Sequence, residues 1–142
     1  IWIREILAGN NIKIFGDGKQ KRAFSDIKYC MLAFEKLITK GNNEIFNIGA
    51  DKEYRILEVA KLTQKIAREL DFNPQIEHIE ERNEVKDAFC IHTKVKKMLG
   101  FKDETDIQKT IREMFDWAKQ QPVRPQKSIK YEIDKNMYKS WK

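Results

Sequence analysis

The sequence predicts an α/β domain in which short strands alternate with amphipathic helices. Apolar residues recur at helical spacing in several stretches, and short apolar runs bounded by glycine or proline stand between these stretches. The pattern contains no internal repeat. A chain of 142 residues is about one domain long, which is enough to bury a single core.

The first part of the chain predicts two helices and a strand. Residues 2–8 carry Trp2, Ile3, Ile6 and Leu7 at helical spacing and stop at Gly9, a C-terminal signal. Residues 12–15 are apolar and predict a short strand. A second helix begins at Asp26, an N-cap candidate, and ends at Gly41. One side of this helix carries an apolar stripe of Ile27, Met31, Phe34, Leu37 and Ile38.

A strand over 44–49 and a helix from about 56 to 70 follow. The helix has a buried stripe of Ile56, Val59, Ala60, Thr63, Ile66, Ala67 and Leu70. Pro74 ends it, and residues 75–79 predict a third strand.

Two further helices complete the pattern. A brief helix over 94–99 ends at Gly100. The last helix begins with the capping-box sequence Thr105-Asp106-Ile107-Gln108 and keeps its apolar period until Pro122. We therefore divide the chain into a domain over 1–121 and a basic, aromatic-rich extension over 122–142.

Composition excludes several protein classes. The hydrophobic content of 41% and charged content of 35% are typical of a folded chain rather than a disordered one. No apolar run is long enough to span a bilayer and residues 1–8 contain no export signal, so we expect a cytoplasmic protein without a membrane partner. The net charge of +6 suggests nucleic acid, but lysines and arginines are spread along the chain and balanced locally by acids. We therefore expect no nucleic-acid partner.

The two cysteines, Cys30 and Cys90, exclude a disulfide framework and favour a reducing compartment. Cys90-x-His92, with Cys30 and His78 elsewhere, offers a metal site as an alternative, but this spacing matches no zinc pattern. We predict no metal, with Cys30 as a small core residue on a helix and Cys90 as a packed strand residue. A general-base role is the alternative for His92, against a cap or surface position.

Two stretches carry side chains suited to an anion. The strand over 12–15 breaks into a turn with Gly16 and Gly18, whose backbones can adopt positive φ and approach a ligand closely. Arg22 follows with a planar fork of donors that suits phosphate or carboxylate. Arg82 and Glu84 lie sixty residues later in an acidic loop. The alternatives are an ordinary turn, a surface arginine and a local Glu–Arg pair.

In this order and separation, the two stretches resemble the nucleotide-sugar-binding half of the NAD-dependent epimerase/dehydratase family, the extended short-chain dehydrogenases. The family pattern is matched at Gly16, Asp17, Gly18, Gln20, Arg22 and Phe24. The resemblance covers nearly all of residues 1–121 and is greatest to UDP-glucose 4-epimerase-like members, although dehydratases and decarboxylases share these motifs. It implies a small substrate-binding α/β domain whose dinucleotide-binding domain is largely missing.

The resemblance also implies roles for particular residues. Arg22 and Arg82 would contact the diphosphate of a UDP-sugar, and Phe15 and the backbone around Lys13 would lie against the base. Glu84 would accept the ribose hydroxyls, with Asp87 as the alternative, because Asn83 alone stands where the family has a Pro-Gly pair.

The resemblance implies that NAD is held by the parent enzyme, an isomerase of carbohydrate metabolism, rather than by this chain. The family's glycine-rich cofactor turn does not occur here, and neither Tyr29 nor Tyr54 begins a Tyr-x-x-x-Lys pair, because Ala33 and Glu58 stand four residues on. We therefore expect no catalytic residue, no cofactor site and an inactive isolated fragment. The apolar ends of the chain, including Trp2 and Ile6, predict an incompletely covered face. That face would take the N-terminal dinucleotide-binding domain or, in a homo-oligomer, another copy. The alternative is a free-standing, non-enzymatic binding or assembly module.

Overall fold

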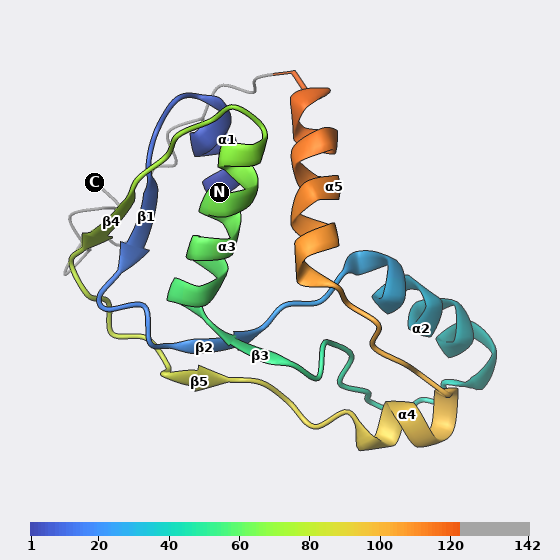
Figure 1. The fold of residues 1–142 in the computed structure, drawn as a ribbon. Coiled ribbons are helices and arrows are strands. Elements are labelled where there is room, and N and C mark those ends of the chain that lie inside the picture. Colours follow the sequence, from blue (N-terminus) through green and yellow to red (C-terminus); the bar gives the residue numbers. More distant parts are fainter. Residues whose placement is uncertain (123–142) are drawn as a thin grey trace, which may run out of the picture.

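The computed structural model of the protein describes residues 1–122 (Figure 1), so the predicted extension lies outside the described residues except for Pro122. In chain order the elements are α1 (Trp2–Leu7), β1 (Ile12–Phe15), β2 (Lys21–Ala23), α2 (Ile27–Lys40), β3 (Glu53–Arg55), α3 (Ile56–Glu69), β4 (Ile76–Ile79), β5 (Asp87–Ala88), α4 (Thr93–Leu99) and α5 (Ile107–Lys119). The predicted α/β class is confirmed. Among these residues no helix combines the length and apolarity needed to cross a bilayer.

Two small sheets organise the strands. β1 pairs with β4 in parallel, with Ile12 opposite Ile76 and Phe15 opposite Ile79. The second sheet has the order β3-β2-β5, in which β2 is antiparallel to β3 and parallel to β5. The strand pattern over 12–15 predicted β1, whereas β2, β3 and β5 have only two or three residues each and were not predicted.

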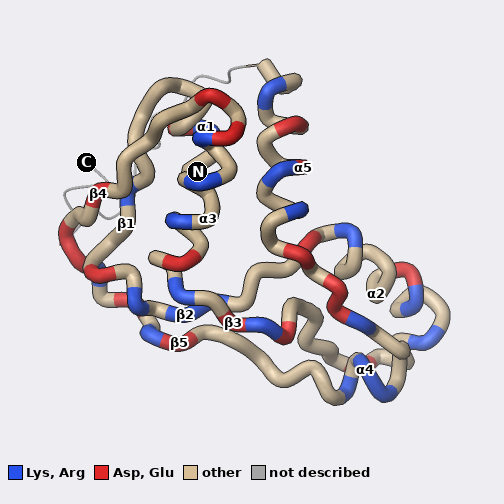
Figure 2. Tube along the Cα trace, in the orientation of Figure 1, with Lys and Arg blue, Asp and Glu red and all other residues tan. Residues whose placement is uncertain are grey.

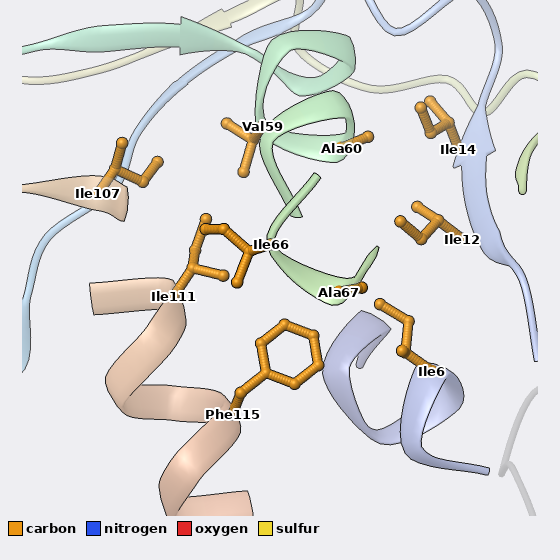
Figure 3. Close-up of a cluster of buried hydrophobic side chains, with 10 residues drawn as sticks. All are labelled: Ile6, Ile12, Ile14, Val59, Ala60, Ile66, Ala67, Ile107, Ile111 and Phe115. Carbon is orange, nitrogen blue, oxygen red and sulfur yellow. The ribbon is translucent and has the colours of Figure 1, made fainter. Parts of the chain in front are cut away.

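The main core lies between β1 and three helices. α1 and α3 pack against β1, and α5 packs against both helices. Figure 3 shows Phe115 pointing from α5 toward Ile6 of α1 and Ala67 of α3. The stripe predicted for α3 is confirmed, because its buried residues are Val59, Ala60, Thr63, Ile66 and Ala67.

A smaller cluster joins α2 to α4, away from β1 and β4 in Figure 1. Its buried residues are Ala33, Val95, Leu99 and Phe101. Asp26 caps α2 by accepting from the Lys28 N–H at 3.0 Å and ties it to α5 by accepting from the Thr110 hydroxyl at 2.8 Å. Burial opposes the ionisation of Asp26, but these hydrogen bonds outweigh it and hold the pKa below its ordinary value.

The apolar stripe of α2 faces solvent rather than a core. Ile27 is 68% exposed and Ile38 is 85% exposed, and Met31 and Phe34 are also exposed. Only Leu37 of the predicted stripe packs against the smaller cluster. The helix turns Ala33 toward α4 instead, so its more apolar side is left uncovered by residues 1–122.

The strand predicted over 44–49 is absent from the described residues. This segment passes from α2 toward β3 with no strand beside it, and backbone pairing is what defines a strand. Phe46 and Ile48 pack against the smaller cluster, while Ile45 is 86% exposed. The prediction of a strand here is therefore wrong for residues 1–122, which contain no partner strand for this segment.

Two smaller predictions also need correction. The N-terminal apolar residues do not form an uncovered face, because Ile6 is only 1% exposed and Trp2, Ile3 and Leu7 pack against the main core. The N-cap of α5 is Asp106, whose carboxylate accepts from the N–H groups of Gln108 and Lys109. Thr105 instead donates its hydroxyl to Asp103 at 2.6 Å.

Candidate functional site

The turn after β1 is held against neighbouring elements. Gly16 and Gly18 have φ of +64° and +71°, as the sequence predicted from two glycines at these positions. A Cβ at Gly18 would lie 3.0 Å from Leu57 Cβ, and the Gly18 carbonyl accepts from the Leu57 N–H at 3.0 Å. The second glycine therefore permits close packing against the first turn of α3. His78 Nδ1 donates to the Gly16 carbonyl at 2.7 Å and fixes the other side of the turn.

Arg22 extends from β2, the middle strand of the second sheet. Its Nη1 donates to the Lys21 carbonyl at 2.7 Å and to the Lys86 carbonyl, just before β5, at 3.1 Å. These bonds hold one side of the guanidinium against the backbone. The other terminal nitrogen, Nη2, faces the carboxylate of Glu84. The short pairing of β2 with β5 thus brings Arg22 beside the loop that carries Arg82.

Arg82 lies in the loop between β4 and β5 and covers the ring of Phe15. The guanidinium carbon is 3.3 Å from the centroid of the ring, a close cation–π stack. The Arg82 side chain is 20% exposed. Phe15 is the last residue of β1, so this contact joins the end of the first sheet to the β4–β5 loop.

Glu84 stands between the two arginines. Its Oε2 lies 3.5 Å from Arg22 Nη2, and its Oε1 lies 3.9 Å from Arg82 Nη1. Two guanidinium groups from distant segments therefore meet at one carboxylate, which is 37% exposed. Figure 2 shows the acidic stretch that follows β4 in red, and Lys and Arg in blue on all the helices.

The other two predicted residues both lie on β1. Lys13 and Phe15 are alternate residues of β1 and share the face opposite the buried Ile12 and Ile14. Within residues 1–122 no hydrogen bond or ion pair joins the Lys13 side chain to the arginines or Glu84, and its carbonyl accepts from the indole of Trp2 at 2.8 Å. Asp87, the alternative to Glu84, is exposed on β5 opposite Lys21.

A second polar arrangement was only partly visible in the sequence. Cys90 is exposed in the loop between β5 and α4, so the prediction of a packed strand residue is wrong. Its Sγ lies 2.9 Å from Nε2 of His92, the buried N-cap residue of α4. His92 Nδ1 lies 3.1 Å from Asp51 Oδ1, and Lys96 Nζ lies 2.6 Å from Asp51 Oδ2. The Cys-x-His spacing signalled the first pair, but nothing in the sequence pointed to Asp51.

These residues do not converge on a metal ion. The cysteine sulfur and the aspartate oxygen contact opposite nitrogens of the imidazole, so they cannot share one ion with the ring between them. No group of three or more potential ligands among the described residues could hold a metal. Cys30 is a helix residue as predicted, but it is only partly buried, and burial raises the pKa of its thiol.

Sequence comparison identifies relatives that act on UDP-sugars. The chain is 27% identical over 115 residues to an Arabidopsis thaliana trifunctional UDP-glucose 4,6-dehydratase/UDP-4-keto-6-deoxy-D-glucose 3,5-epimerase/UDP-4-keto-L-rhamnose-reductase, covering 80% of this chain and 17% of that protein. It is 28% identical to the UDP-N-acetyl-alpha-D-glucosaminuronate decarboxylase of Bacillus cytotoxicus, covering 84% and 39%. It is 31% identical to a putative UDP-glucose 4-epimerase of Methanocaldococcus jannaschii, covering 84% and 38%. The chain thus spans well under half of each relative.

Solved structures share the fold. The UDP-glucose 4-epimerase of Thermotoga maritima, determined with UDP-glucose, superposes with a TM-score of 0.75 at 23% identity, over 83% of this chain and 38% of that one. The UDP-glucuronic acid 4-epimerase of Bacillus cereus, in complex with UDP-glucuronic acid and NAD, gives 0.72 at 23% identity, over 84% and 38%. Residues 1–49 also match the model of the NAD dependent epimerase/dehydratase family. The chain therefore has part of the extended short-chain dehydrogenase fold, and its sequence relatives are UDP-sugar epimerases, dehydratases and decarboxylases.

Proposed function

We propose that this chain is the nucleotide-sugar-binding portion of an NAD-dependent epimerase and that it takes a UDP-sugar at Phe15, Arg22 and Arg82. The meeting of two arginines at the single carboxylate of Glu84 carries the proposal. A diphosphate bears two negative charges, and arginine cannot lose its proton to avoid them. The space between the two guanidinium groups already holds one oxyanion, so it suits a second kind of oxyanion from a ligand.

Each residue has a distinct task in this proposal. The diphosphate replaces the Glu84 carboxylate between the arginines, and Glu84 turns to accept the ribose hydroxyls. The uracil lies along the exposed face of β1, against Phe15 and the backbone near Lys13. Arg82 is held by its stack on Phe15 and Arg22 by two backbone carbonyls. Both guanidinium groups are therefore oriented before the ligand arrives, which reduces the entropy lost on binding.

The hydride chemistry belongs in this proposal to a dinucleotide-binding domain that holds NAD. NAD bound there would supply the hydride chemistry, while the arginines of this chain would hold the diphosphate of the sugar nucleotide. The 142 residues contain no glycine-rich cofactor turn, and neither Tyr29 nor Tyr54 is followed by lysine four residues on. We therefore propose that this chain binds substrate but does not turn it over alone.

The binding preference of the isolated chain tests the proposal. We expect isothermal titration calorimetry to show weak UDP binding and no heat from NAD, because the proposed site combines the arginine pair with a surface for uracil and the 142 residues contain no glycine-rich cofactor turn. UMP is the matched control: its single phosphate offers less negative charge and fewer acceptor oxygens to the two arginines than a diphosphate does, so it should bind more weakly than UDP. NAD binding without UDP binding would contradict the assignment.

We further propose that the uncovered side of α2 is the docking surface for that dinucleotide-binding domain. The docking surface consists of Ile27, Met31, Phe34, Ile38 and Ile45. An apolar patch of this kind usually marks an interface. The segment over 44–49 pairs with no strand among residues 1–122, so its backbone is available to the edge of a further sheet. Where no such domain is present, a second copy of the chain covers the same surface and gives a homo-oligomer.

The docking surface predicts that the 142-residue chain self-associates at micromolar concentration. The variant Ile38→Glu should shift the chain toward monomer in sedimentation velocity, because a charge would be desolvated in the interface. Met114→Glu is the control, since Met114 is also exposed, at 52%, but lies on α5 outside this surface. A strictly monomeric parent chain would refute the docking surface and favour a free-standing module.

A further inference from the structure

The loop that leads into α4 holds a row of three side chains unrelated to the UDP-sugar site. In this row, Cys90, His92 and Asp51 are joined through the two nitrogens of one imidazole. The arrangement has the order of a nucleophile, its base and the group that orients the base. Cys90 is exposed at one end, whereas the His92 side chain is only 1% exposed.

The hydrogen bonds assign the protons in this row. Because a carboxylate only accepts, Nδ1 of His92 carries the hydrogen that is shared with Asp51. Nε2 is then the basic nitrogen, and it faces the sulfur of Cys90. Asp51 is itself fixed by Lys96, whose hydrogen bond, together with that of His92, holds the pKa of this carboxyl below its ordinary value. Asp51 thus stays ionised and can stabilise an imidazolium.

We infer that Cys90 is a nucleophilic thiol, activated by His92 and Asp51, that exchanges with low-molecular-weight disulfides. A thiolate is the reacting form of cysteine, and a paired histidine is among the features that produce it. Since Cys90 stands on an exposed loop, small disulfides can reach its sulfur directly. The inference does not depend on the proposed UDP-sugar function.

The thiol–disulfide exchange needs only Cys90, His92 and the small disulfide, with no further oxidant or reductant. His92 Nε2 takes the proton of the Cys90 thiol, and the thiolate attacks one sulfur of the disulfide R–S–S–R. A sulfur–sulfur bond to Cys90 forms while the original bond breaks. The departing RS⁻ takes the proton back from the imidazolium, which leaves one mixed disulfide and one free thiol.

Cys30 provides an internal comparison. It lies on α2, is partly buried, and has a thiol pKa that burial raises. Trypsin separates the two cysteines into different peptides, 29–36 and 87–94, because each is bounded by lysines. The reaction rates of both thiols can therefore be measured in one reaction mixture.

The experiment treats the 142-residue chain with glutathione disulfide at pH 6.5 and follows both mixed disulfides by peptide mass spectrometry. An ordinary thiol is about 1% ionised at this pH, so we expect Cys90 in the folded chain to react about ten-fold faster than Cys90 in urea. Cys30 should react more slowly folded than in urea. Folded Cys90 that reacts no faster than unfolded Cys90 would overturn the inference.

Variants in a Cys30→Ser background separate activation from exposure. His92→Gln and Asp51→Asn should each reduce the folded rate to about that of the urea-unfolded chain, while circular dichroism shows a retained fold. Lys94→Gln is the matched control, because it removes a nearby cation that pairs with Glu44 rather than with the row. If His92→Gln does not fold, the inference is tested by the rate of Asp51→Asn and by the ratio of the Cys90 reaction rates in the folded and the urea-unfolded parent chain. If either His92→Gln or Asp51→Asn folds and Cys90 still reacts at the parent rate, the inference that His92 and Asp51 activate Cys90 is refuted.

Discussion

Removing either arginine from the site weakens UDP binding by about ten-fold or more. A hydrogen bond to a charged group contributes about 1.5 to 3 kcal/mol, and about 1.4 kcal/mol corresponds to a ten-fold change in affinity. Arg22→Ala and Arg82→Ala should therefore each raise the dissociation constant in the same calorimetric titration. Because both act on one diphosphate, the double variant should lose a different amount from the sum of the single losses.

The control for this pair is Arg4→Ala. Arg4 has a side chain that is 58% exposed and pairs only with its neighbour Glu5 among the ion pairs of the described residues, so its removal should leave UDP affinity unchanged. Neither site variant should unfold the domain, since both arginines lie outside the buried core. Loss of UDP binding in Arg22→Ala but not in Arg82→Ala would show that the two residues do not share one ligand.

Phe115→Ala should lower the free energy of unfolding by about 3 to 5 kcal/mol. Phe115 is 0% exposed and stacks on Phe72 with ring centroids 6.5 Å apart. Truncation would leave a cavity where α1, α3 and α5 meet (Figure 3). A whole domain is stable by only about 5 to 15 kcal/mol, so this single change removes a large share.

Urea denaturation measures this loss against a neighbouring residue. Met114 precedes Phe115 on α5 but is 52% exposed, so Met114→Ala should change the free energy of unfolding by less than about 0.5 kcal/mol. Equal effects of the two substitutions would show that α5 does not bury the face that carries Phe115.

The helices were largely predictable because their signals are local. Gly9 and Gly100 end α1 and α4 with positive φ, and the 3.6-residue period of α3 matches its buried side. The period of α2 was equally clear, but it shows only that the apolar residues share a side. Whether that side meets a core depends on what covers it, which a single helix does not encode. The prediction of a strand over 44–49 was wrong for the same reason, since a strand needs a partner.

The anion site was predictable in its residues but not in its assembly. Arg22 and Arg82 were identified from short motifs, whereas the pairing of β2 with β5 that aligns them has too few residues to leave a pattern. The position of Glu84 between the arginines is a tertiary contact, and the sequence suggested only a role toward ribose. The exposure of Cys90 was not predicted, because its apolar neighbours Phe89 and Ile91 give the sequence pattern of a buried strand. In the structure both neighbours are exposed.

The bond from Arg22 to the Lys86 carbonyl spans 64 residues, and this separation has a consequence for how the chain folds. Closing a loop costs conformational entropy that grows by about 0.6 kcal/mol with each doubling of its length. β2 and β5 offer only two paired positions to offset that cost, so they cannot nucleate folding by themselves. We therefore expect the helices between them to pack first and to shorten the distance. The guanidinium pair would then form late in folding, and a peptide containing either segment alone would lack it.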